Sequence, residues 1–416
     1  MDLTSLEALF SPYGQTVLQS AQALQPHEVE YLRHYQTLCR KFPAELVRPA
    51  LETAILRQEA TVKYPAPLAA RMYLTREALE QATPFEVSTY RAERYRSQFS
   101  PACIVDLGCS IGSDTMALTS IAPTLGIDRD PLRLRMAYAN LDTFSNMPEL
   151  AKDVHQVCFL QANLMNPLPI TSQASTALFF DPARRANQRR IFSVDDYQPP
   201  LSMIGEWLPQ FPALGVKLSP GVDLSELAEY QAEIEFISLY GELKECVLWF
   251  GPLRNTARRA TLLPSRAQMA SEELASISEP AAQLSPPQSF LYEPDPAILR
   301  AGLVRSLAEQ INAAQLDPDI AYLTSRELTP TPFARAWLIE DWFPFQLKRL
   351  RSHLREHGIG KVTVKKRGSP LEPEALIHSL RLEGEAARIL VLTHLKGEPI
   401  VLICLPVSNW EDSLIK

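Results

Sequence analysis

The spacing of apolar and polar positions changes near residue 100. In residues 1–95, apolar residues recur every three or four positions, as in HEVEYLRHYQTLCRKF and AELVRPALETAILRQEA. This spacing is typical of amphipathic helices. The stretch has no glycine after Gly14 and is rich in Leu, Ala, Glu, Gln and Arg, which are good helix formers. The pattern therefore predicts a helical N-terminal domain over residues 1–95.

From about residue 101, short apolar runs alternate with helix-like segments. The runs are ACIVDLG, PTLGID, QVCFLQAN, STALFFDP, ALGVKLSP, AEIEFISL and ECVLWFG. Short apolar strands separated by helices are typical of a parallel sheet covered on both faces. The last two runs, 232–239 and 244–250, lie too close together for a crossover helix, so they are expected to pair antiparallel. The pattern predicts a seven-stranded, Rossmann-like α/β domain over 96–252 whose last strand is antiparallel.

Composition divides the rest of the chain. Residues 253–290 are rich in Ser, Ala and Pro, which favours a linker or a mobile insertion. Residues 291–345 have a mixed pattern that we interpret as mainly helical. Residues 346–416 predict a small α/β module: an amphipathic helix, the strand KVTVKK, the helix PEALIHSL and two final strands.

Composition and charge narrow the class of protein. Hydrophobic residues make up 46% and charged residues 21% of the 416 positions, which is ordinary for globular proteins. No apolar run is long enough to span a membrane, and no secretory signal is present. The six cysteines form no CxxC pair, so a zinc ribbon or dithiol site has no support. We expect a cytoplasmic protein of several domains, with no membrane segment and no metal.

The segment VDLGCSIGSD at 105–114 closes the first strand of the sheet and opens a helix. Gly108 and Gly112 let the backbone turn tightly and approach a ligand. A dinucleotide fingerprint has a glycine where Ser110 stands. The spacing is instead acidic-x-Gly-x-small-x-Gly, beginning at Asp106, which is the form of the cofactor loop in S-adenosylmethionine-dependent methyltransferases. There the acid acts near the methionine ammonium, through water or backbone groups. The alternative is a Rossmann-type domain that binds NAD or no ligand.

Two further strand ends carry polar residues that suit an adenosyl group. Asp128 ends the second strand, where a carboxylate accepts hydrogen bonds from both ribose hydroxyls. Asn163 follows the third strand, where methyltransferases often have an acid that accepts the adenine amino proton. Its amide oxygen accepts the same bond more weakly. Together these residues predict S-adenosyl-L-methionine as the cofactor.

The fourth strand ends in FFDPARR, at the sheet edge where acceptor and cofactor should meet. Asp181 and Pro182 match the (Asp/Asn)-Pro-Pro-aromatic motif of adenine-N6 methyltransferases, but Ala183 and Arg184 do not. Uracil-C5 methyltransferases with a similar motif need a cysteine after the fifth strand, which here ends in KLSP. Direct in-line transfer remains, with Asp181 as the acceptor-orienting group or base. The alternative is that Asp181 only caps a following helix.

Two basic groups favour contacts to phosphates, although the net charge of −7 argues against nucleic-acid binding by the whole surface. The first group is Arg184, Arg185, Arg189 and Arg190. The second lies in 348–367 and comprises Lys348, Arg349, Arg351, Arg355, Lys361, Lys365, Lys366 and Arg367, opposed only by Glu356. A basic helix beside a basic strand suits an RNA-binding face. Solvated surface charge is the alternative for both groups.

The motif HxxEH at 353–357 also occurs in zinc peptidases. Its cationic surroundings and the end of the helix at Gly358 disfavour a metal site here, because histidine in a last helical turn compensates the helix dipole.

The chain resembles the bacterial class I methyltransferases that carry a C-terminal THUMP-like domain. The resemblance rests on LTREALEQATPFEVSTYRAERY, VDLGCSIGSD, GIDRDP, FFDPARR, VKLSPGVD, GELKECVLWFG, FLYEPDPAILRAGLV and the terminal basic module. It implies a helical N-terminal region, a seven-stranded methyltransferase domain, a ferredoxin-like connecting segment at 291–345 and a THUMP-like module at 346–416. By analogy with THUMP domains it also implies an RNA acceptor. Ser110 and Asn163 depart from the family pattern.

The leading hypothesis is a methyltransferase that uses S-adenosylmethionine and acts on tRNA or rRNA. Its candidate RNA contacts are Arg184, Arg185, Lys348, Arg349, Lys365, Lys366 and Arg367. Two alternatives stay open: a small-molecule methyltransferase, and a non-catalytic RNA-binding protein with a vestigial cofactor pocket.

Overall fold

A computed structural model of the chain describes residues 1–151, 153–171, 175–183, 185–186, 189–190, 193–271 and 283–407. Two compact units are distinguished by their internal contacts. The first comprises Met1–Glu233 and Cys246–Asn255, and the second comprises Ile234–Glu245 and Thr256–Lys416. In the described residues, no helix combines the length and the apolar character needed to cross a membrane.

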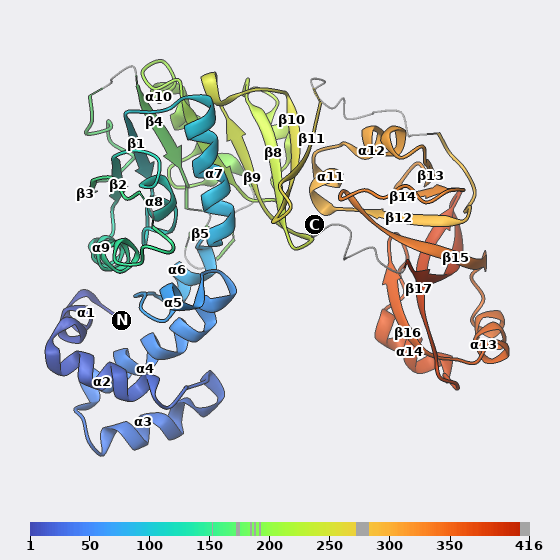
Figure 1. The fold of residues 1–416 in the computed structure, drawn as a ribbon, viewed down its shortest axis with the longest axis horizontal. Helices are drawn as coiled ribbons and strands as arrows, with labels where there is room; N and C mark the ends of the chain where they lie inside the picture. The colour runs from blue at the N-terminus through green and yellow to red at the C-terminus, as the bar shows by residue number, and fades with distance from the viewer. Residues whose placement is uncertain are drawn as a thin grey trace. The chain divides into compact units, whose positions relative to one another are not determined.

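Helices form the start of the first unit, which confirms the predicted helical N-terminal region. In order they are α1 (Leu3–Phe10), α2 (Pro12–Gln22), α3 (Tyr31–Cys39), α4 (Ala44–Glu59), α5 (Ala66–Ala69), α6 (Arg76–Gln81) and α7 (Phe85–Gln98). Their inner faces bury Leu6, Leu51 and Leu68, among others. This shared apolar burial stabilises helices that are too short to be stable alone. Figure 1 shows α7 extending from the helical group along the sheet.

A nine-stranded sheet follows in the order β11-β10-β8-β9-β7-β4-β1-β2-β3. Its strands are β1 (Cys103–Leu107), β2 (Thr124–Asp128), β3 (Val157–Gln161), β4 (Thr176–Phe180), β7 (Leu214–Leu218), β8 (Glu233–Leu239), β9 (Glu242–Trp249), β10 (Arg258–Leu263) and β11 (Ala267–Ser271). Strands β1, β2, β3, β4 and β7 are parallel, whereas β9 pairs antiparallel with β7. The α/β class and the reversed strand agree with the sequence-based prediction.

The sheet is larger than the predicted seven strands, because part of the segment 253–290 is not a linker. Strands β10 and β11 form an antiparallel pair in which Arg258 lies opposite Ser271 and Leu262 lies opposite Ala267. Apolar side chains of β10, including Ala260 and Leu262, are buried. This short hairpin was not predicted, because the Ser, Ala and Pro content of the whole segment favours a loop. Residues 272–282 of the segment lie outside the described residues.

Buried polar contacts join the helical group to the loop after β1 and to the helices that follow β1 and β2. Asn140 of α9 (Pro131–Ser145) is fully buried, and its side-chain amide donates to the carbonyls of Tyr73 and Ile111, each at 3.0 Å. Tyr64 Oη lies 2.5 Å from Ser113 Oγ at the start of α8 (Ser113–Leu118). Because Ile111 and Ser113 belong to the glycine loop, the helical group holds the loop that was predicted to bind the cofactor.

The second unit contains a seven-stranded sheet in the order β13-β14-β12-β15-β18-β17-β16. Its strands are β12 (Phe290–Pro294), β13 (Ala314–Asp317), β14 (Ile320–Ser325), β15 (Ala334–Pro344), β16 (Ile359–Lys366), β17 (Ala386–Leu395) and β18 (Glu398–Pro406). Its helices are α11 (Pro296–Arg300), α12 (Val304–Gln310), α13 (Leu347–Glu356) and α14 (Pro373–Leu380). Helices α13 and α14 pack on β16 and bury Leu350, Leu354 and Leu376.

The segment 291–345 differs from its predicted mainly helical character. It forms four strands and two short helices, and its last strand, β15, pairs with β18 of the C-terminal module. The hydrophobic pattern there is mixed because several of these short strands bury apolar residues on both faces, as β12 does with Leu291 and Tyr292.

Candidate active site

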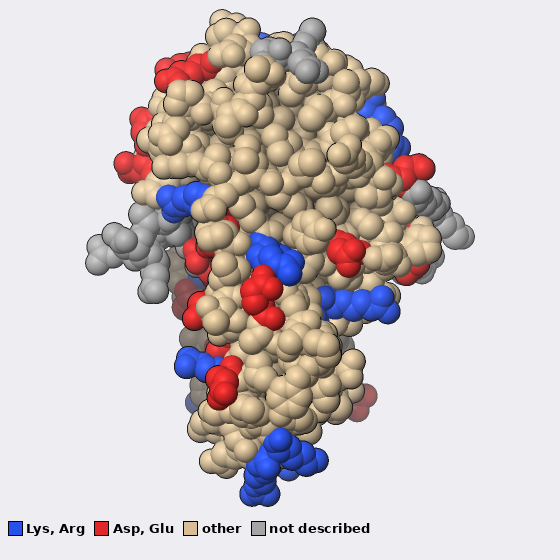
Figure 2. Space-filling model, turned by 90° about the vertical axis from the view of Figure 1, so that its left-hand side faces the viewer, with Lys and Arg blue, Asp and Glu red and all other residues tan. Residues whose placement is uncertain are grey.

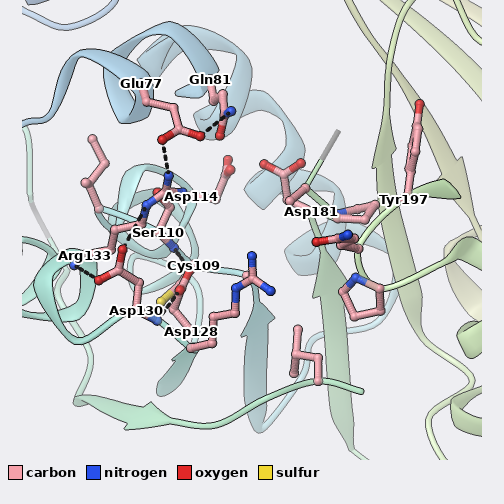
Figure 3. A pocket seen from close by; sticks show the side chains of 18 of the residues that line it. Glu77, Gln81, Cys109, Ser110, Asp114, Asp128, Asp130, Arg133, Asp181 and Tyr197 are labelled. Atoms are coloured by element: carbon pink, nitrogen blue, oxygen red, sulfur yellow. Dashed lines mark hydrogen bonds and ion pairs between the residues drawn. The ribbon is translucent and has the colours of Figure 1, made fainter. Parts of the chain in front are cut away.

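A cleft of about 940 Å³ lies in the first unit, where the predicted cofactor loop meets the ends of several strands. Residues that directly follow β1, β2, β3 and β4 line it, together with α6, the turn after α6, and the segment 196–200. Figure 3 shows Asp128 and Ser110 on one side of this cleft and Asp181 on the other. Open parallel sheets bind ligands at this edge.

The glycine loop requires Gly108 for steric reasons. Its φ is +87°, and a Cβ at this position would lie 2.7 Å from the carbonyl oxygen of Asp181. Gly112 also has a positive φ, +83°, and begins α8. Ser110 has a φ of +49°, which is costly for a residue other than glycine. Its conformation is held by its N–H, which donates to Asp128 Oδ2 at 2.9 Å.

Asp128 is held by two backbone groups. Its Oδ2 accepts from Ser110 N and its Oδ1 accepts from Asp130 N, both at 2.9 Å. Each carboxylate oxygen has a further lone pair, so the side chain can accept two hydroxyl hydrogen bonds without moving. Asp130 also caps α9 by accepting from Leu132 N at 2.8 Å. This geometry fits the predicted contact to a ribose.

Asn163 lines the cleft beyond β3, as the sequence pattern predicts, but its amide oxygen already has a partner. Oδ1 accepts from Met165 N at 3.1 Å in a tight turn. Leu164 is buried and Met165 is exposed, and both line the same wall. This wall therefore presents apolar surface, suited to the face of a base, beside a single amide.

Asp106 lies behind the glycine loop and is not part of the cleft lining. Its side chain is 1% exposed, and its Oδ2 accepts from Thr115 Oγ1 at 2.6 Å. Its Oδ1 is buried with no hydrogen-bond partner among the described residues. Burial, and next the charge of Asp114, raise the pKa of Asp106 to about 8. A role of Asp106 near a bound ammonium, acting through water or the loop backbone, stays a prediction.

Asp181 and Pro182 both line the cleft. Asp181 N donates to the carbonyl of Leu107 at 3.0 Å, which fixes the end of β4 beside β1. The Asp181 carboxylate accepts from Lys217 Nζ at 2.7 Å. The next helical turn in the described chain starts at Val194 and is capped by Ser193, so Asp181 does not act as its cap.

Sequence reasoning missed the wall that the N-terminal helical region contributes. Glu77 and Gln81 of α6 line the cleft, and Glu77 forms an ion pair with Arg133 at 3.2 Å (Figure 3). Arg133 Nη1 also donates to Ser110 Oγ at 3.4 Å. Lys63 Nζ donates to the carbonyls of residues 79, 80 and 82, each at 2.8 Å, and so holds the end of α6. No local motif identifies this wall, although it lies in the segment that carries the family resemblance.

A buried ion pair supports the wall from behind. Arg91 of α7 is 2% exposed and pairs with Asp114 at 2.5 Å. Thr83 donates to the same carboxylate at 3.1 Å, and the Arg91 guanidinium lies over the ring of Phe179. These contacts join α7, α8 and the turn after α6.

The basic residues predicted to contact RNA fall into different settings. Lys365 pairs with Glu293, and Lys366 pairs with Glu372, both at 2.6 Å. Arg367 lies over the ring of Tyr322. Lys348 and Arg349 are exposed on α13, and the Arg349 guanidinium lies over the ring of Phe343. Arg184 and the side chain of Arg185 lie outside the described residues.

Acidic and basic side chains are mixed elsewhere on the surface. On the face drawn in Figure 2, Lys and Arg lie singly or in small groups among Asp and Glu.

In the HxxEH motif, the ring of His353 stacks on that of His357 at 4.2 Å. Within the described ranges, no group of three His, Cys, Asp or Glu side chains is arranged to hold a metal ion.

The reversed β9, the glycine loop and the anchored Asp128 define an α/β protein of the nucleoside-cofactor-binding, methyltransferase type. Two uncharacterised S-adenosylmethionine-dependent methyltransferases of Mycobacterium tuberculosis, from strains CDC 1551 and H37Rv, are each 33% identical to it over 356 residues. The match covers 83% of this chain and 92% of each relative. The chain belongs to the S-adenosylmethionine-dependent methyltransferases.

Two further comparisons agree with this assignment. A crystal structure of a candidate methyltransferase from Porphyromonas gingivalis W83 has the same fold, with a TM-score of 0.74 and 22% identity, over 94% of this chain and 98% of its own. The family described as THUMP domain-like matches residues 334–406, and a domain of unknown function (DUF8688) matches residues 2–60. The protein is therefore a methyltransferase with a THUMP-like C-terminal domain.

The cleft fits S-adenosylmethionine, which when bound supplies a methyl group on a positively charged sulfur. Asp128 would hold the ribose, the glycine loop would hold the methionine portion, and Met165 would contact the base. Acidic side chains outnumber basic ones in the described lining, which suits a cationic ligand. The acidic residues are Glu77, Glu80, Asp114, Asp128, Asp130, Asp181 and Asp196, and the basic ones are Arg129 and Arg133.

Proposed function

We propose that this protein is a cytoplasmic RNA methyltransferase that acts on tRNA or rRNA by direct in-line transfer. The observation that supports an RNA acceptor best is the outer face of α13. Lys348, Arg349 and Arg355 are exposed there and have no acidic partner in the described part of the chain. The helix lies in the THUMP-like domain.

The spacing of α13 separates its charged and apolar faces. Leu350 and Leu354 are buried against the sheet, whereas Lys348 and Arg355 project from the opposite side. Exposed cations without acidic partners on a rigid helix suit the phosphates of a nucleic acid, and releasing counterions supplies much of such binding. The paired Lys365 and Lys366 are weaker candidates, because an RNA phosphate would have to displace Glu293 and Glu372.

Asp181 is the residue proposed to act on the acceptor. Its Oδ1 makes no hydrogen bond or ion pair in the described ranges, and its side chain lines the cleft opposite Asp128. It would orient the acceptor and hold the proton that leaves as the acceptor gains a methyl group. Pro182 follows it in the chain and also lines the cleft. Positioning of this kind supplies a large share of the rate in a direct transfer.

Tritium-labelled S-adenosylmethionine tests the proposal directly. The purified protein is incubated with total RNA from a strain that lacks its gene and with RNA from the parent strain. Label should enter a tRNA or rRNA fraction of the deletion strain, and parent RNA should accept little because its sites are already filled. Asp181→Ala should abolish the transfer.

The same experiment separates the alternatives. Label that appears only in a small-molecule extract would identify a small-molecule methyltransferase. No transfer to either pool, with retained RNA binding, would identify a non-catalytic RNA-binding protein. Comparing the modified nucleosides of the two strains then names the product.

A further inference from the structure

A buried lysine lies beneath the acceptor end of the cleft. Lys217 is in β7, whose residues are all buried, and it is 4% exposed. Its Nζ is 2.7 Å from Asp181 Oδ2. A buried ammonium is costly unless it is paired, so its place in an otherwise apolar strand requires a partner. Asp181 is the hydrogen-bonding partner of this side chain in the described residues.

Strand order explains why the two side chains meet. In the register of β4 and β7, Phe180 pairs with Val216, so the next residues on each strand, Asp181 and Lys217, lie side by side. The two members of the pair differ in exposure: the Lys217 side chain is 5% exposed and the Asp181 side chain is 23% exposed. The cation is therefore inside the sheet, and the carboxylate forms the wall of the cleft.

The surrounding charges leave this pairing to Lys217 alone. The charges of Asp114 and Asp181 both contribute to the raised pKa of Asp106. Asp114 has its own cation, Arg91, at 2.5 Å. Without Lys217, Asp181 would lie near the Asp106 carboxyl group with no direct counter-charge among the described residues.

We infer that Lys217 is the positioning residue for Asp181, and that the acceptor atom carries a hydrogen. This inference rests on the proposed role of Asp181. Lys217 fixes Oδ2 and leaves Oδ1 to accept a hydrogen bond from an N–H or O–H group in the cleft. During transfer a lone pair of the acceptor would form the bond to the methyl carbon, and the carbon–sulfur bond would break with its electron pair left on the sulfur, which leaves as a neutral thioether. The acceptor keeps the electron pair of its bond to hydrogen, and the proton passes to Asp181 and then to water.

A stability experiment on the cofactor-free protein tests the pairing independently of activity. Urea unfolding is measured for the wild type, Lys217→Met, Asp181→Asn and the double variant. Lys217→Met should lower the urea midpoint because it leaves a carboxylate without its cation. Adding Asp181→Asn should restore the midpoint, since residues in contact give non-additive effects. Additive effects would show that the two residues are not coupled and would overturn the inference.

Transfer kinetics test the positioning role. Cofactor affinity of Lys217→Met should stay within about threefold of wild type, whereas single-turnover transfer to RNA from the deletion strain should fall by about 30-fold or more. Lys217→Arg should recover part of this rate. When Lys217→Met is added to Asp181→Asn, the single-turnover rate should fall by less than about threefold further, because the partner of Lys217 is already lost. A full additional loss there would contradict a role through Asp181.

The product identifies the acceptor class. The inference is supported if the methyl group is found on an amino nitrogen, on a ring nitrogen that bears a hydrogen before transfer, or on a hydroxyl oxygen. A methyl group on a ring nitrogen that bears no hydrogen would overturn it while leaving the RNA methyltransferase proposal intact. If no RNA accepts a methyl group, the proposed function fails, and the urea experiment still decides whether Lys217 and Asp181 are coupled.

Discussion

Carboxylates around the cleft occupy different settings, and each setting follows from its neighbours in the fold. Asp128 is ordered by two backbone N–H groups, Asp114 by Arg91, and Asp181 by Lys217. Asp106 has one hydroxyl partner and one buried oxygen without a partner. The same residue type therefore serves to accept hydroxyl groups, to join helices, and to face the acceptor.

The buried Asp106 makes stability depend on pH. Its pKa is raised from an ordinary value of 3.8 to about 8. Between these values the folded protein holds a proton that the unfolded chain has released, so the free energy of unfolding falls as pH rises through this range. Asp106→Asn removes the titrating group and can still accept the hydrogen bond from Thr115.

The expected result is that Asp106→Asn gains stability relative to the wild type as the pH rises from about 5 to about 8. Urea unfolding of both cofactor-free proteins at several pH values measures this difference. A difference that stays constant over the range would show that Asp106 is ionised in the folded protein.

Residues that belong to local motifs could be identified from the sequence, whereas their partners could not. Gly108 and Asp128 stand at fixed places relative to apolar strands, and the spacing alone indicates a nucleoside site. Lys217 was visible only as a residue of the fifth strand. Its contact with Asp181 depends on β4 and β7 being neighbours in the sheet. Arg91 meets Asp114 only because α7 packs against α8.

Helix α6 links the N-terminal helical region to the cofactor site. Lys63 holds its last turn through three carbonyl groups, which lack partners within the helix. Lys63→Met should loosen this wall and weaken binding of S-adenosylmethionine about 3- to 30-fold, since hydrogen bonds to a charged group are lost.

Calorimetric titration checks this expectation. Lys41→Met serves as the control, because Lys41 is exposed and lies outside the cleft lining. Equal affinity in Lys63→Met and the wild type would mean that α6 does not contribute to the bound state.

Helix α13 and strands β16 and β17 allow a matched test of the RNA-binding surface. Lys348→Gln, Arg349→Gln and Arg355→Gln together remove three exposed cations without acidic partners in the described residues. RNA affinity at low salt should fall about 10- to 100-fold. The slope of the logarithm of the binding constant against the logarithm of the salt concentration should become less steep by about 2 to 3.

The control removes the same number of charges from paired positions. Lys365, Lys366 and Arg388 pair with Glu293, Glu372 and Glu340, respectively. Replacing these three by Gln should change RNA binding much less, as measured by fluorescence anisotropy with bulk tRNA. If the control set weakens binding more than the α13 set, the contact surface lies on the strand side of the module.

The sequence predicted strongly patterned elements better than weakly patterned ones. The amphipathic α13 and the apolar strands β1 and β4 agree with their predicted positions. The hairpin of β10 and β11 was missed, because its short strands lie in a segment whose Ser, Ala and Pro content favours a loop. Their stability comes from pairing with each other and of β10 with β8, which a local pattern does not reveal.

At the scale of the whole molecule, a linear division of the sequence does not describe the packing. The first unit ends at Glu233 and resumes at Cys246, while Ile234–Glu245 belongs to the second unit. A single boundary after residue 252 does not describe a segment that belongs to the second unit and is followed by one that belongs to the first. The THUMP-like match likewise begins at residue 334 instead of 346, in agreement with the pairing of β15 and β18.

The whole chain combines a net charge of −7 with a basic segment at 348–367. Attraction of RNA is therefore expected to be confined to part of the surface, and the acidic cleft is expected to attract the cationic cofactor. Cofactor affinity and RNA affinity should accordingly respond to different substitutions.

Titration of the full chain with S-adenosylmethionine, for the wild type, Asp128→Ala and Asp181→Asn, decides whether the cleft is the cofactor site. The wild type should bind one cofactor per chain, and Asp128→Ala should bind it about 10- to 100-fold more weakly because ribose hydrogen bonds are lost. Asp181→Asn should bind within about threefold of wild type, because Asp181 is assigned to the acceptor. Unchanged affinity in Asp128→Ala, or loss of binding in Asp181→Asn alone, would contradict the assignment of the cleft.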